Sequence, residues 1–152
     1  MTGVDECAWT CEHVRNKKLC NALRKLPGVR SPRELLSAAM RISMSKAKAA
    51  KAKFEAAARA SSREGNPMAS ILNTCVEGYD NVVHALEEAQ ECIDTNDSKA
   101  NLVTKMSSAS TFTDDCSNGF DEREMEPSFA AVQRNVKRVV SSTLAIAAKL
   151  KQ

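Results

Sequence analysis

Residues 67–120 decide the fold of this chain, and they read PMASILNTCVEGYDNVVHALEEAQECIDTNDSKANLVTKMSSASTFTDDCSNGF. Apolar and small residues recur there in alternating steps of three and four, on both sides of a polar break at residues 95–98. The repeated positions are Leu72, Cys75, Tyr79, Val82, Leu86, Ala89 and Ile93 before the break, and Leu102, Met106, Ala109, Thr113, Cys116 and Phe120 after it. A hydrophobic period of about 3.5 residues is typical of helices in a left-handed bundle. The stretch therefore predicts two helices folded back on each other.

The flanking sequence carries the same pattern twice more. Inward positions are expected at Leu36, Met40, Ser43, Ala47, Ala50, Phe54 and Ala57, and again at Phe129, Val132, Val136, Val139, Thr143, Ile146 and Leu150. Ser31 to Glu34 form a capping box, Gly65 ends a helix, and Pro67 and Pro127 open the next ones. We predict helices over 32–63, 67–94, 98–118 and 127–151. Because their connections are short, we expect an all-α, up-down-up-down four-helix bundle.

The length and composition fit one domain. A chain of 152 residues has the size of an ordinary single domain, in which we expect residues 1–30 to form an N-terminal helical hairpin and residues 31–152 the bundle. Aromatic residues are only 4% of the chain, which disfavours a β-sandwich. No run approaches the roughly 20 apolar residues of a membrane span, so we expect no membrane partner. Residues 1–11 also lack the apolar run of a signal peptide, so a secreted form would be the mature protein.

The net charge of +3 conceals three segments of opposite sign. Residues 1–63 hold 14 Lys and Arg against 5 Asp and Glu, and residues 64–126 hold 3 against 14. Residues 127–152 hold 5 basic residues and no acidic ones. A nucleic-acid-binding protein is expected to keep an unopposed basic face. We therefore predict that the segments neutralise one another when packed, and that the protein has no nucleic-acid partner.

Two of the six cysteines are placed to form a bridge across the helical hairpin. Cys75 and Cys116 are equally far from the polar break and both occupy inward positions, so antiparallel packing brings them to the same height. We predict a Cys75–Cys116 disulfide, with two buried thiols as the alternative. The bridge would close a loop of about 40 residues and stabilise the fold by about 4 kcal/mol in the chain-entropy model.

The other cysteines lie near the two ends of helical segments. Cys11 and Cys20 flank a polar turn, which fits a small helical hairpin closed by its own disulfide, although Cys7–Cys20 is a competing pairing. Cys7 and Cys92 remain. The alternatives for them are a disulfide, oxidised sulfur or free thiols, and we favour free thiols. A zinc site is disfavoured because the paired short Cys/His spacings of structural zinc motifs are missing. Six cysteines in a chain of this size favour an oxidising compartment.

The residues offer little for catalysis. The chain has only two histidines, of which His13 lies in the N-terminal hairpin and His84 at the flank of the acidic helix. No Ser/His/Asp set, Glu-x-x-His pair or glycine-rich phosphate loop is present. We therefore predict that the protein is not an enzyme and takes no cofactor or metal.

Several short motifs together resemble a known family. They are Cys11-x8-Cys20, Cys75-x3-Tyr79-Asp80, Ala85 to Ala89, Met106 to Ala109, and Cys116-x2-Gly119-Phe120. This set is similar to the plant invertase and pectin methylesterase inhibitor family over nearly the whole chain. The resemblance implies a four-helix bundle with an N-terminal hairpin, two disulfides and no catalysis. It also implies secretion to the apoplast and cell wall, or transport to the vacuole, and a partner that is acid invertase or pectin methylesterase.

The two targets are distinguished by different stretches of the family. Invertase inhibitors present Asp-Pro-Lys-Phe between the second and third bundle helices, where this chain has Asp97-Ser98-Lys99-Ala100. Pectin methylesterase inhibitors commonly have Glu-Asp after the last bridging cysteine, where this chain has Ser117-Asn118. Because Asp97 and Lys99 match, the residues favour invertase slightly, with Asp97, Ser98 and Lys99 as candidate contacts. The alternative for Asp97 and Ser98 is helix capping.

Asn96-Asp97-Ser98 is in addition an N-glycosylation sequence on the same polar break. A glycan on Asn96 would obstruct docking there. A second hypothesis for the whole chain is a helical bundle that binds a ligand or receptor without inhibiting an enzyme. We expect a monomer, or a dimer formed by exchange of the N-terminal hairpin.

Overall fold

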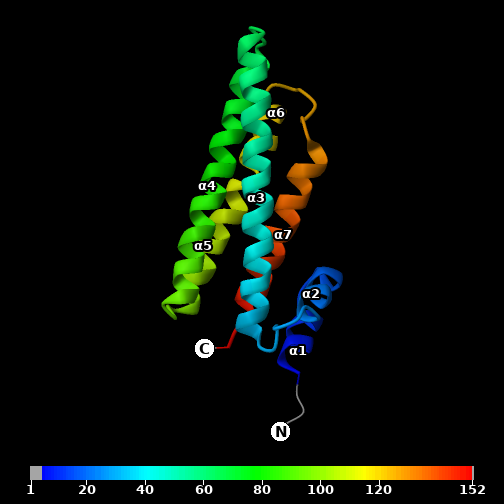
Figure 1. Cartoon of the computed structure of the whole chain (residues 1–152), viewed down its shortest axis with the longest axis vertical. Coiled ribbons are helices and arrows are strands. Elements are labelled where there is room, and N and C mark those ends of the chain that lie inside the picture. Colours follow the sequence, from blue (N-terminus) through cyan, green and yellow to red (C-terminus); the bar gives the residue numbers. More distant parts are fainter. Residues whose placement is uncertain (1–4, 152) are drawn as a thin grey trace.

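The computed structural model describes residues 5–151, and the helices in that range form a four-helix bundle with a small hairpin at one end (Figure 1). The helices are α1 (Glu6–Glu12), α2 (Lys17–Arg24), α3 (Pro32–Arg63), α4 (Met68–Asp94), α5 (Lys99–Phe112), α6 (Asp115–Glu122) and α7 (Ala130–Ala148). The predicted all-α class is confirmed. Residues 1–4 of the predicted hairpin region, and residue 152, lie outside the described range.

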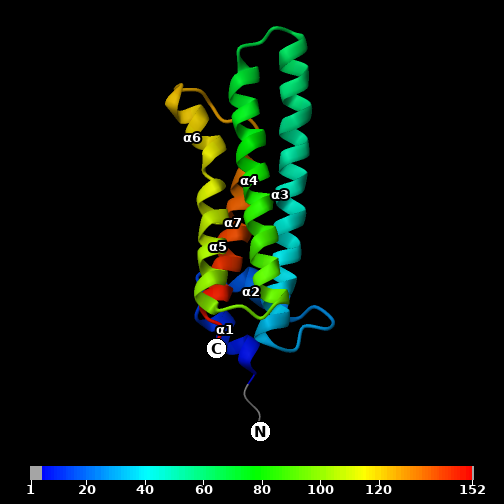
Figure 2. The same cartoon turned by 90° about the vertical axis from the view of Figure 1, so that its left-hand side faces the viewer.

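The bundle is built on α3 and α4, which run antiparallel and extend beyond the other helices at one end (Figure 2). Helix α3 also packs against α7, α4 packs against α5 and α6, and α5 packs against α7, so the four long elements form a closed ring around one core. The α1–α2 hairpin, the α4–α5 turn and the C-terminal end of the chain lie together at the opposite end (Figures 1 and 2).

The core consists largely of the inward positions that the sequence predicts. Its largest fully buried side chains include Leu36, Met40, Phe54, Tyr79, Leu86, Met106, Phe120 and Ile146. The Phe54 and Tyr79 rings stack with their centroids 5.6 Å apart. The prediction is wrong at Ala57, which is only half-buried while Ala58 is buried. A straight helix has 3.6 residues per turn, so over a helix of 32 residues the buried face moves away from a strict 3.5 period.

The third predicted helix, over 98–118, is divided into α5 and α6. The Thr113 hydroxyl donates to the Ser110 carbonyl at the division, and such hydroxyl bonds compete with the helical ones and bend the chain. Thr113, Cys116 and Phe120 nevertheless remain buried, because the two helices keep the same phase.

The fourth helix is shorter than predicted. It begins at Ala130 instead of residue 127 and ends at Ala148 instead of residue 151. Phe129 precedes it in a left-handed conformation (φ 54) and is 37% exposed, so its predicted inward position is wrong. This conformation places the Phe129 ring edge-on against Phe54 at 5.3 Å, beneath the Lys53 ammonium group. Gln133 also donates to the Ser128 carbonyl at 2.8 Å, which ties the residues before the helix to its first turn.

The predicted ends of α3 are confirmed. Ser31 Oγ accepts the Glu34 backbone N–H at 3.2 Å, which is one half of the predicted capping box. The Glu34 carboxylate accepts the N–H of Arg30 at 3.0 Å, one residue before the N-cap, in place of the N–H of Ser31. After the last turn, Gly65 takes a positive φ of 66, and the Asn66 N–H donates back to the Ser61 carbonyl at 2.8 Å. Glycine permits this left-handed end without a steric penalty.

Two disulfides connect the helices. Cys75 and Cys116 join α4 to α6, with 4.3 Å between their Cα atoms, and Cys11 and Cys20 join α1 to α2, with 5.3 Å. The Cys7 and Cys92 thiols are free and buried within the described residues. Burial is the main reason why the pKa of both thiols is raised, which makes them poor nucleophiles.

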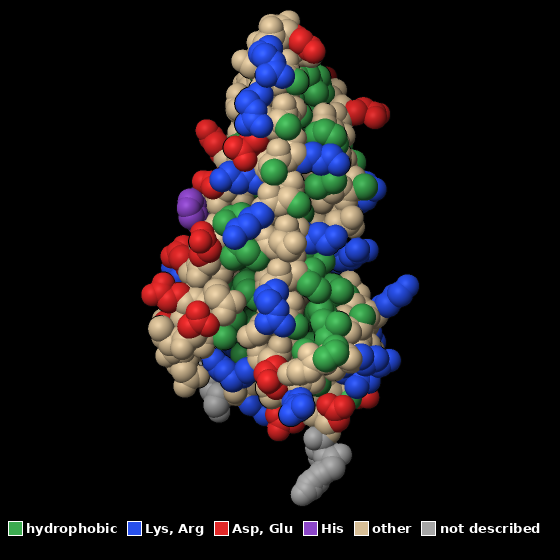
Figure 3. Space-filling model, viewed as in Figure 1, with side chains coloured by type: hydrophobic (Ala, Val, Ile, Leu, Met, Phe, Trp, Pro, Cys, Tyr) green, Lys and Arg blue, Asp and Glu red, His purple; other side chains and the backbone are tan. Residues whose placement is uncertain are grey.

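The oppositely charged segments meet through ion pairs between helices. Lys51 on α3 lies 2.8 Å from Asp80 on α4, and Lys137 on α7 lies 3.0 Å from Asp114. In Figure 3, Lys and Arg are spread over α3 and α7, while acidic side chains gather along the edge formed by α4. Among the described helices, none combines the length and the apolar character that a membrane crossing needs.

Candidate functional site

The α4–α5 turn, residues 95–98, is a compact helix end followed at once by a helix start. The Asn96 N–H donates to the Ile93 carbonyl at 3.2 Å, and the Asp97 N–H donates to the Cys92 carbonyl at 2.8 Å. Asn96 is left-handed, with a φ of 55. These features together form a Schellman motif, in which asparagine takes the position that glycine usually occupies. The chain therefore reverses direction in a turn of well-defined shape.

The predicted contact residues are held by hydrogen bonds within this turn. One Asp97 carboxylate oxygen accepts the Ser98 N–H at 2.7 Å, and the Asn101 side chain donates to both carboxylate oxygens at 3.1 and 3.2 Å. Ser98 Oγ accepts the Asn101 N–H at 3.1 Å, which makes Ser98 the N-cap of α5. The backbone bond from Ser98 is the first cause that lowers the pKa of Asp97, followed by the bond from Asn101. Asp97 is therefore a fixed negative charge on an exposed turn.

Basic residues from distant parts of the sequence surround this charge. A hollow of about 370 Å³ lies beside the turn and is lined by Arg33, Asn96, Asp97, Ser98, Lys99, Leu102, Leu150 and Lys151. Arg33, at the start of α3, donates to the Ile93 carbonyl at 3.4 Å and so connects α3 to the end of α4. The structure thus brings Asp97, Ser98 and Lys99 together. It adds Arg33 and Lys151, which no local motif indicates because they are remote from the turn in the sequence.

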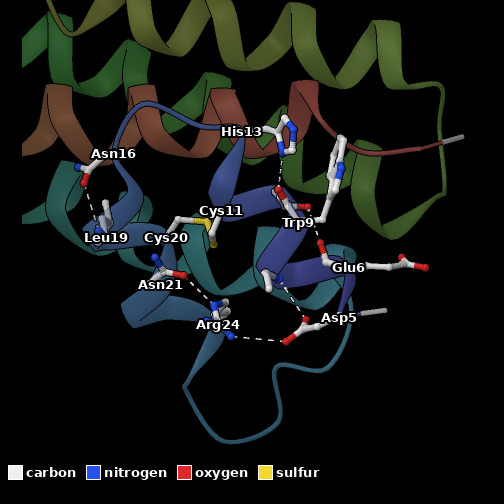
Figure 4. Close-up of a disulfide and its surroundings, with 12 residues drawn as sticks. Asp5, Glu6, Trp9, Cys11, His13, Asn16, Leu19, Cys20, Asn21 and Arg24 are labelled. Atoms are coloured by element: carbon white, nitrogen blue, oxygen red, sulfur yellow. Dashed lines mark hydrogen bonds and ion pairs between the residues drawn. A yellow bond between two sulfur atoms is a disulfide. The ribbon is translucent and has the colours of Figure 1, made fainter. Parts of the chain in front are cut away.

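A second hollow, of about 310 Å³, continues this surface toward α1. It shares Arg33, Leu150 and Lys151 with the first hollow and has Trp9 in its wall. Trp9 is 38% exposed, and its ring stacks on the His13 ring with the centroids 4.3 Å apart (Figure 4). The Lys151 ammonium nitrogen lies 5.3 Å from the centre of the Trp9 ring. We call the surface formed by these two hollows the basal surface. The one sequence feature that could have indicated this surface is the single tryptophan, Trp9, which lies outside all four heptad stripes.

The α1–α2 hairpin gives this end of the molecule its shape. Its disulfide lies between the two short helices, and Arg24 links them by an ion pair of 3.5 Å to Asp5 (Figure 4). Arg24 also donates to the Asn21 side chain at 2.7 Å, and Asn16 caps α2 by accepting the Leu19 N–H at 3.1 Å. The Trp9 side chain is therefore presented from a cross-linked element.

The histidines do not take part in a reactive arrangement. His13 bonds to the Trp9 carbonyl at 2.7 Å, whereas His84 lies on α4 with its ring 3.6 Å from Asp80. Over residues 5–151, His, Cys, Asp and Glu side chains form no group of three that could hold a metal ion. What the geometry offers is a stiff, charged surface with one exposed aromatic ring, which suits the binding of another macromolecule.

A family model described as plant invertase/pectin methylesterase inhibitor matches residues 5–146. This chain belongs to that family. The match covers both disulfides, the whole α4–α5 turn and nearly all of α7, so the resemblance seen in the sequence motifs is confirmed.

Solved structures of the inhibitor family share the fold. A crystal structure of a mutant form of a pectin methylesterase inhibitor from Arabidopsis is 19% identical, with a TM-score of 0.77 and coverage of 98% of this chain and 99% of that one. A second crystal structure, of a pectin methylesterase inhibitor from Arabidopsis thaliana, is 18% identical, with a TM-score of 0.69 and coverage of 99% of both chains. At these identities the likeness concerns the fold. Among curated proteins, no sequence matches this chain.

Proposed function

We propose that this protein is a non-catalytic inhibitor that binds and blocks a plant carbohydrate-active enzyme, either acid invertase or pectin methylesterase. The observation that carries the proposal is the family match over residues 5–146. The disulfide-linked bundle supports it, because a surface that is already rigid loses little conformational entropy when it binds.

The α4–α5 turn is the proposed contact with the enzyme. Asp97 and Lys99 are the residues by which this turn resembles invertase inhibitors, and the turn lies at the end of the bundle that carries the α1–α2 hairpin (Figure 2). The chain lacks the proline and the phenylalanine of that motif, having Ser98 and Ala100 instead. The Schellman motif and the Ser98 cap supply the rigidity that the proline would give. We therefore favour acid invertase as the first target, with pectin methylesterase as the second.

The place of action follows from the same proposal. We propose that the protein is secreted to the apoplast and cell wall, or carried to the vacuole, where disulfides such as Cys11–Cys20 and Cys75–Cys116 persist. It needs no cofactor or metal there, because it inhibits by occupying the enzyme's active-site entrance. It acts as a monomer, or as a dimer in which the α1–α2 hairpins are exchanged.

The decisive experiment is a titration of the purified protein, in a form without a glycan on Asn96, against acid invertase and against pectin methylesterase, each assayed at acidic pH. Inhibition of one enzyme at a stoichiometric ratio is expected. A Lys99→Ala variant should weaken inhibition, because it removes a charge from the proposed contact. Arg59→Ala removes one positive charge from the far part of α3, about 39 Å along that helix from Arg33, and should inhibit like the wild type. Failure to inhibit either enzyme would reject the proposal.

A helical bundle that binds a small ligand is the second candidate. The hollow of about 310 Å³ beside Trp9 favours it, because this volume is at the lower end of the range of small-molecule sites. Quenching of Trp9 fluorescence by a ligand, in a protein that inhibits neither enzyme, would support this candidate over the first.

A further inference from the structure

The α4–α5 turn also contains the only Asn-X-Ser/Thr sequence of the chain, Asn96-Asp97-Ser98. All three residues are exposed. We infer that Asn96 carries an N-linked glycan and that this glycan blocks docking of an enzyme at the turn. The first half of the inference needs only passage through the secretory pathway, and the second half rests on the proposed function.

The conformation of Asn96 leaves its side chain free. Its backbone N–H is used in the Schellman motif, but among residues 5–151 no group hydrogen-bonds to its side-chain amide. Its left-handed φ of 55 is one that asparagine tolerates better than most residues. A substituent on the amide nitrogen would therefore break no hydrogen bond of the described fold.

The modification also requires the hydroxyl of Ser98, which has a structural role in the folded protein. Ser98 Oγ caps α5 by accepting the Asn101 N–H at 3.1 Å. This hydroxyl is available to a transferase while the chain is still unfolded, and it returns to its capping role afterwards, since the sugar is bonded to Asn96 alone. The same tripeptide can thus be modified during synthesis and still form the turn.

The reaction is an ordinary group transfer from a lipid-diphosphate-linked oligosaccharide. The Asn96 amide nitrogen, Nδ2, forms a bond to the anomeric carbon of the first sugar and loses one proton. The bond from that carbon to the diphosphate oxygen breaks, and the lipid diphosphate leaves with the electron pair. No oxidant or reductant is involved.

The consequence for docking follows from where Asn96 lies. It lines the same hollow of about 370 Å³ as Arg33, Asp97 and Lys99, so a branched oligosaccharide on its amide occupies the space in front of the proposed contacts. The faces of α3 and α7 away from this end are not obstructed. Occupancy of Asn96 would therefore separate two populations of the protein, one able to dock through the turn and one unable to do so.

The modification is tested by intact mass of the protein secreted from plant cells, before and after treatment with peptide-N-glycosidase. The mass of the wild type should fall by the mass of an N-glycan, and residue 96 should become Asp. Asn96→Asp should show no loss, whereas Ser98→Thr keeps the acceptor sequence and should still be glycosylated. A wild-type mass equal to that of the unmodified chain would overturn the inference.

The blocking effect is tested by comparing the glycosylated protein with its enzymatically deglycosylated form in the two inhibition assays. Because deglycosylation leaves Asp at position 96, the Asn96→Asp variant is its matched control and should inhibit equally. We expect the glycosylated form to inhibit about tenfold less strongly or not at all. Equal inhibition by glycosylated and deglycosylated forms would overturn the blocking effect. Inhibition by neither form would reject the proposed function, while the mass measurement would still decide whether Asn96 is modified.

Discussion

Ser43 on α3 and Thr143 on α7 share a hydrogen bond of 2.8 Å between their hydroxyl oxygens in the centre of the bundle. Both residues are fully buried, and both hydroxyls also lie within hydrogen-bond distance of the Val139 carbonyl, at 3.2 Å for Ser43 and 2.8 Å for Thr143. A buried hydroxyl lowers stability unless it is hydrogen-bonded, and each of these two has both the other hydroxyl and that carbonyl as partners. The pair therefore joins α3 to α7 by a hydrogen bond within the core.

Removing one hydroxyl of this pair should lower the free energy of unfolding by more than half of the loss caused by removing both. We expect Ser43→Ala and Thr143→Val each to lower the free energy of unfolding by about 1–2 kcal/mol, because the partner hydroxyl loses a bond. The double variant should lose less than the sum of the two. Urea unfolding of the four proteins measures this coupling, and strictly additive losses would show that the two hydroxyls act independently.

The Cys75–Cys116 disulfide should contribute more to stability than the Ser43–Thr143 pair. It closes a loop with a sequence separation of 41, so replacing both cysteines by alanine is expected to lower the free energy of unfolding by about 4 kcal/mol. The matched control is Cys7→Ala with Cys92→Ala, which removes two buried sulfurs but no bridge. Unfolding in urea, with and without dithiothreitol, gives the comparison. If the reductant left the wild type as stable as before, the bridge would not be a stabilising one.

Two glycines in the same region should respond in opposite ways to substitution by alanine. A Cβ on Gly78 would lie 3.1 Å from the Asp115 Cβ, where α4 meets α6, whereas a Cβ on Gly119 would meet its nearest atom, in Thr74, at 3.6 Å. Gly119→Ala should stabilise the protein by up to about 1 kcal/mol through helix propensity. For Gly78→Ala, crowding should exceed this gain and give a net loss of about 1 kcal/mol. Thermal unfolding of the two variants checks the prediction, which a stabilising Gly78→Ala would contradict.

Asp115 should make the protein less stable as the pH rises. Burial, and secondly the neighbouring charge of Asp114, raise the pKa of Asp115 in the folded state. The folded protein therefore binds more protons than the unfolded one between the ordinary aspartate pKa of about 3.9 and this raised pKa. Stability falls as the pH increases through that window. The stability of Asp115→Asn relative to wild type should accordingly increase over the same range.

Asp80 provides a control of opposite sign. The hydrogen bond from Lys51 is the main reason why the pKa of Asp80 is lowered, so this carboxylate contributes stability above the unfolded pKa that is lost as the pH falls through its folded pKa. Asp80→Asn should therefore lose stability relative to wild type as the pH rises from the lowered pKa of Asp80 in the folded state to the ordinary aspartate pKa of the unfolded state. Urea unfolding between pH 3 and 7 measures both variants, and parallel curves for Asp115→Asn and wild type would exclude the Asp115 effect.

Much of the fold was predictable because its causes are local. The heptad stripes on α3 to α7 and the Ser31 and Gly65 helix ends depend on residues a few positions apart, so they can be recognised before any packing is known. The placement of Cys75 opposite Cys116 needed one further step, the antiparallel reversal at the polar break. Periodicity could not locate the bend at Thr113, because the buried face continues through it in the same phase.

The basal surface shows what local pattern leaves undetermined. Arg33, Trp9 and Lys151 come from the beginning of α3, from α1 and from the end of the chain. Packing within the bundle brings Arg33 and Lys151 beside Asp97, and docking of the hairpin then places Trp9 beside Lys151. Phe129 likewise departs from its predicted inward position, and its ring packs edge-on against Phe54 from a left-handed residue before α7. By itself the sequence determined the helices, their order and the antiparallel reversal, since these follow from short-range periodicity and capping. The tertiary structure alone decided which charged and aromatic side chains share a surface, because that depends on packing between segments that are far apart in the sequence, such as those of Trp9 and Lys151.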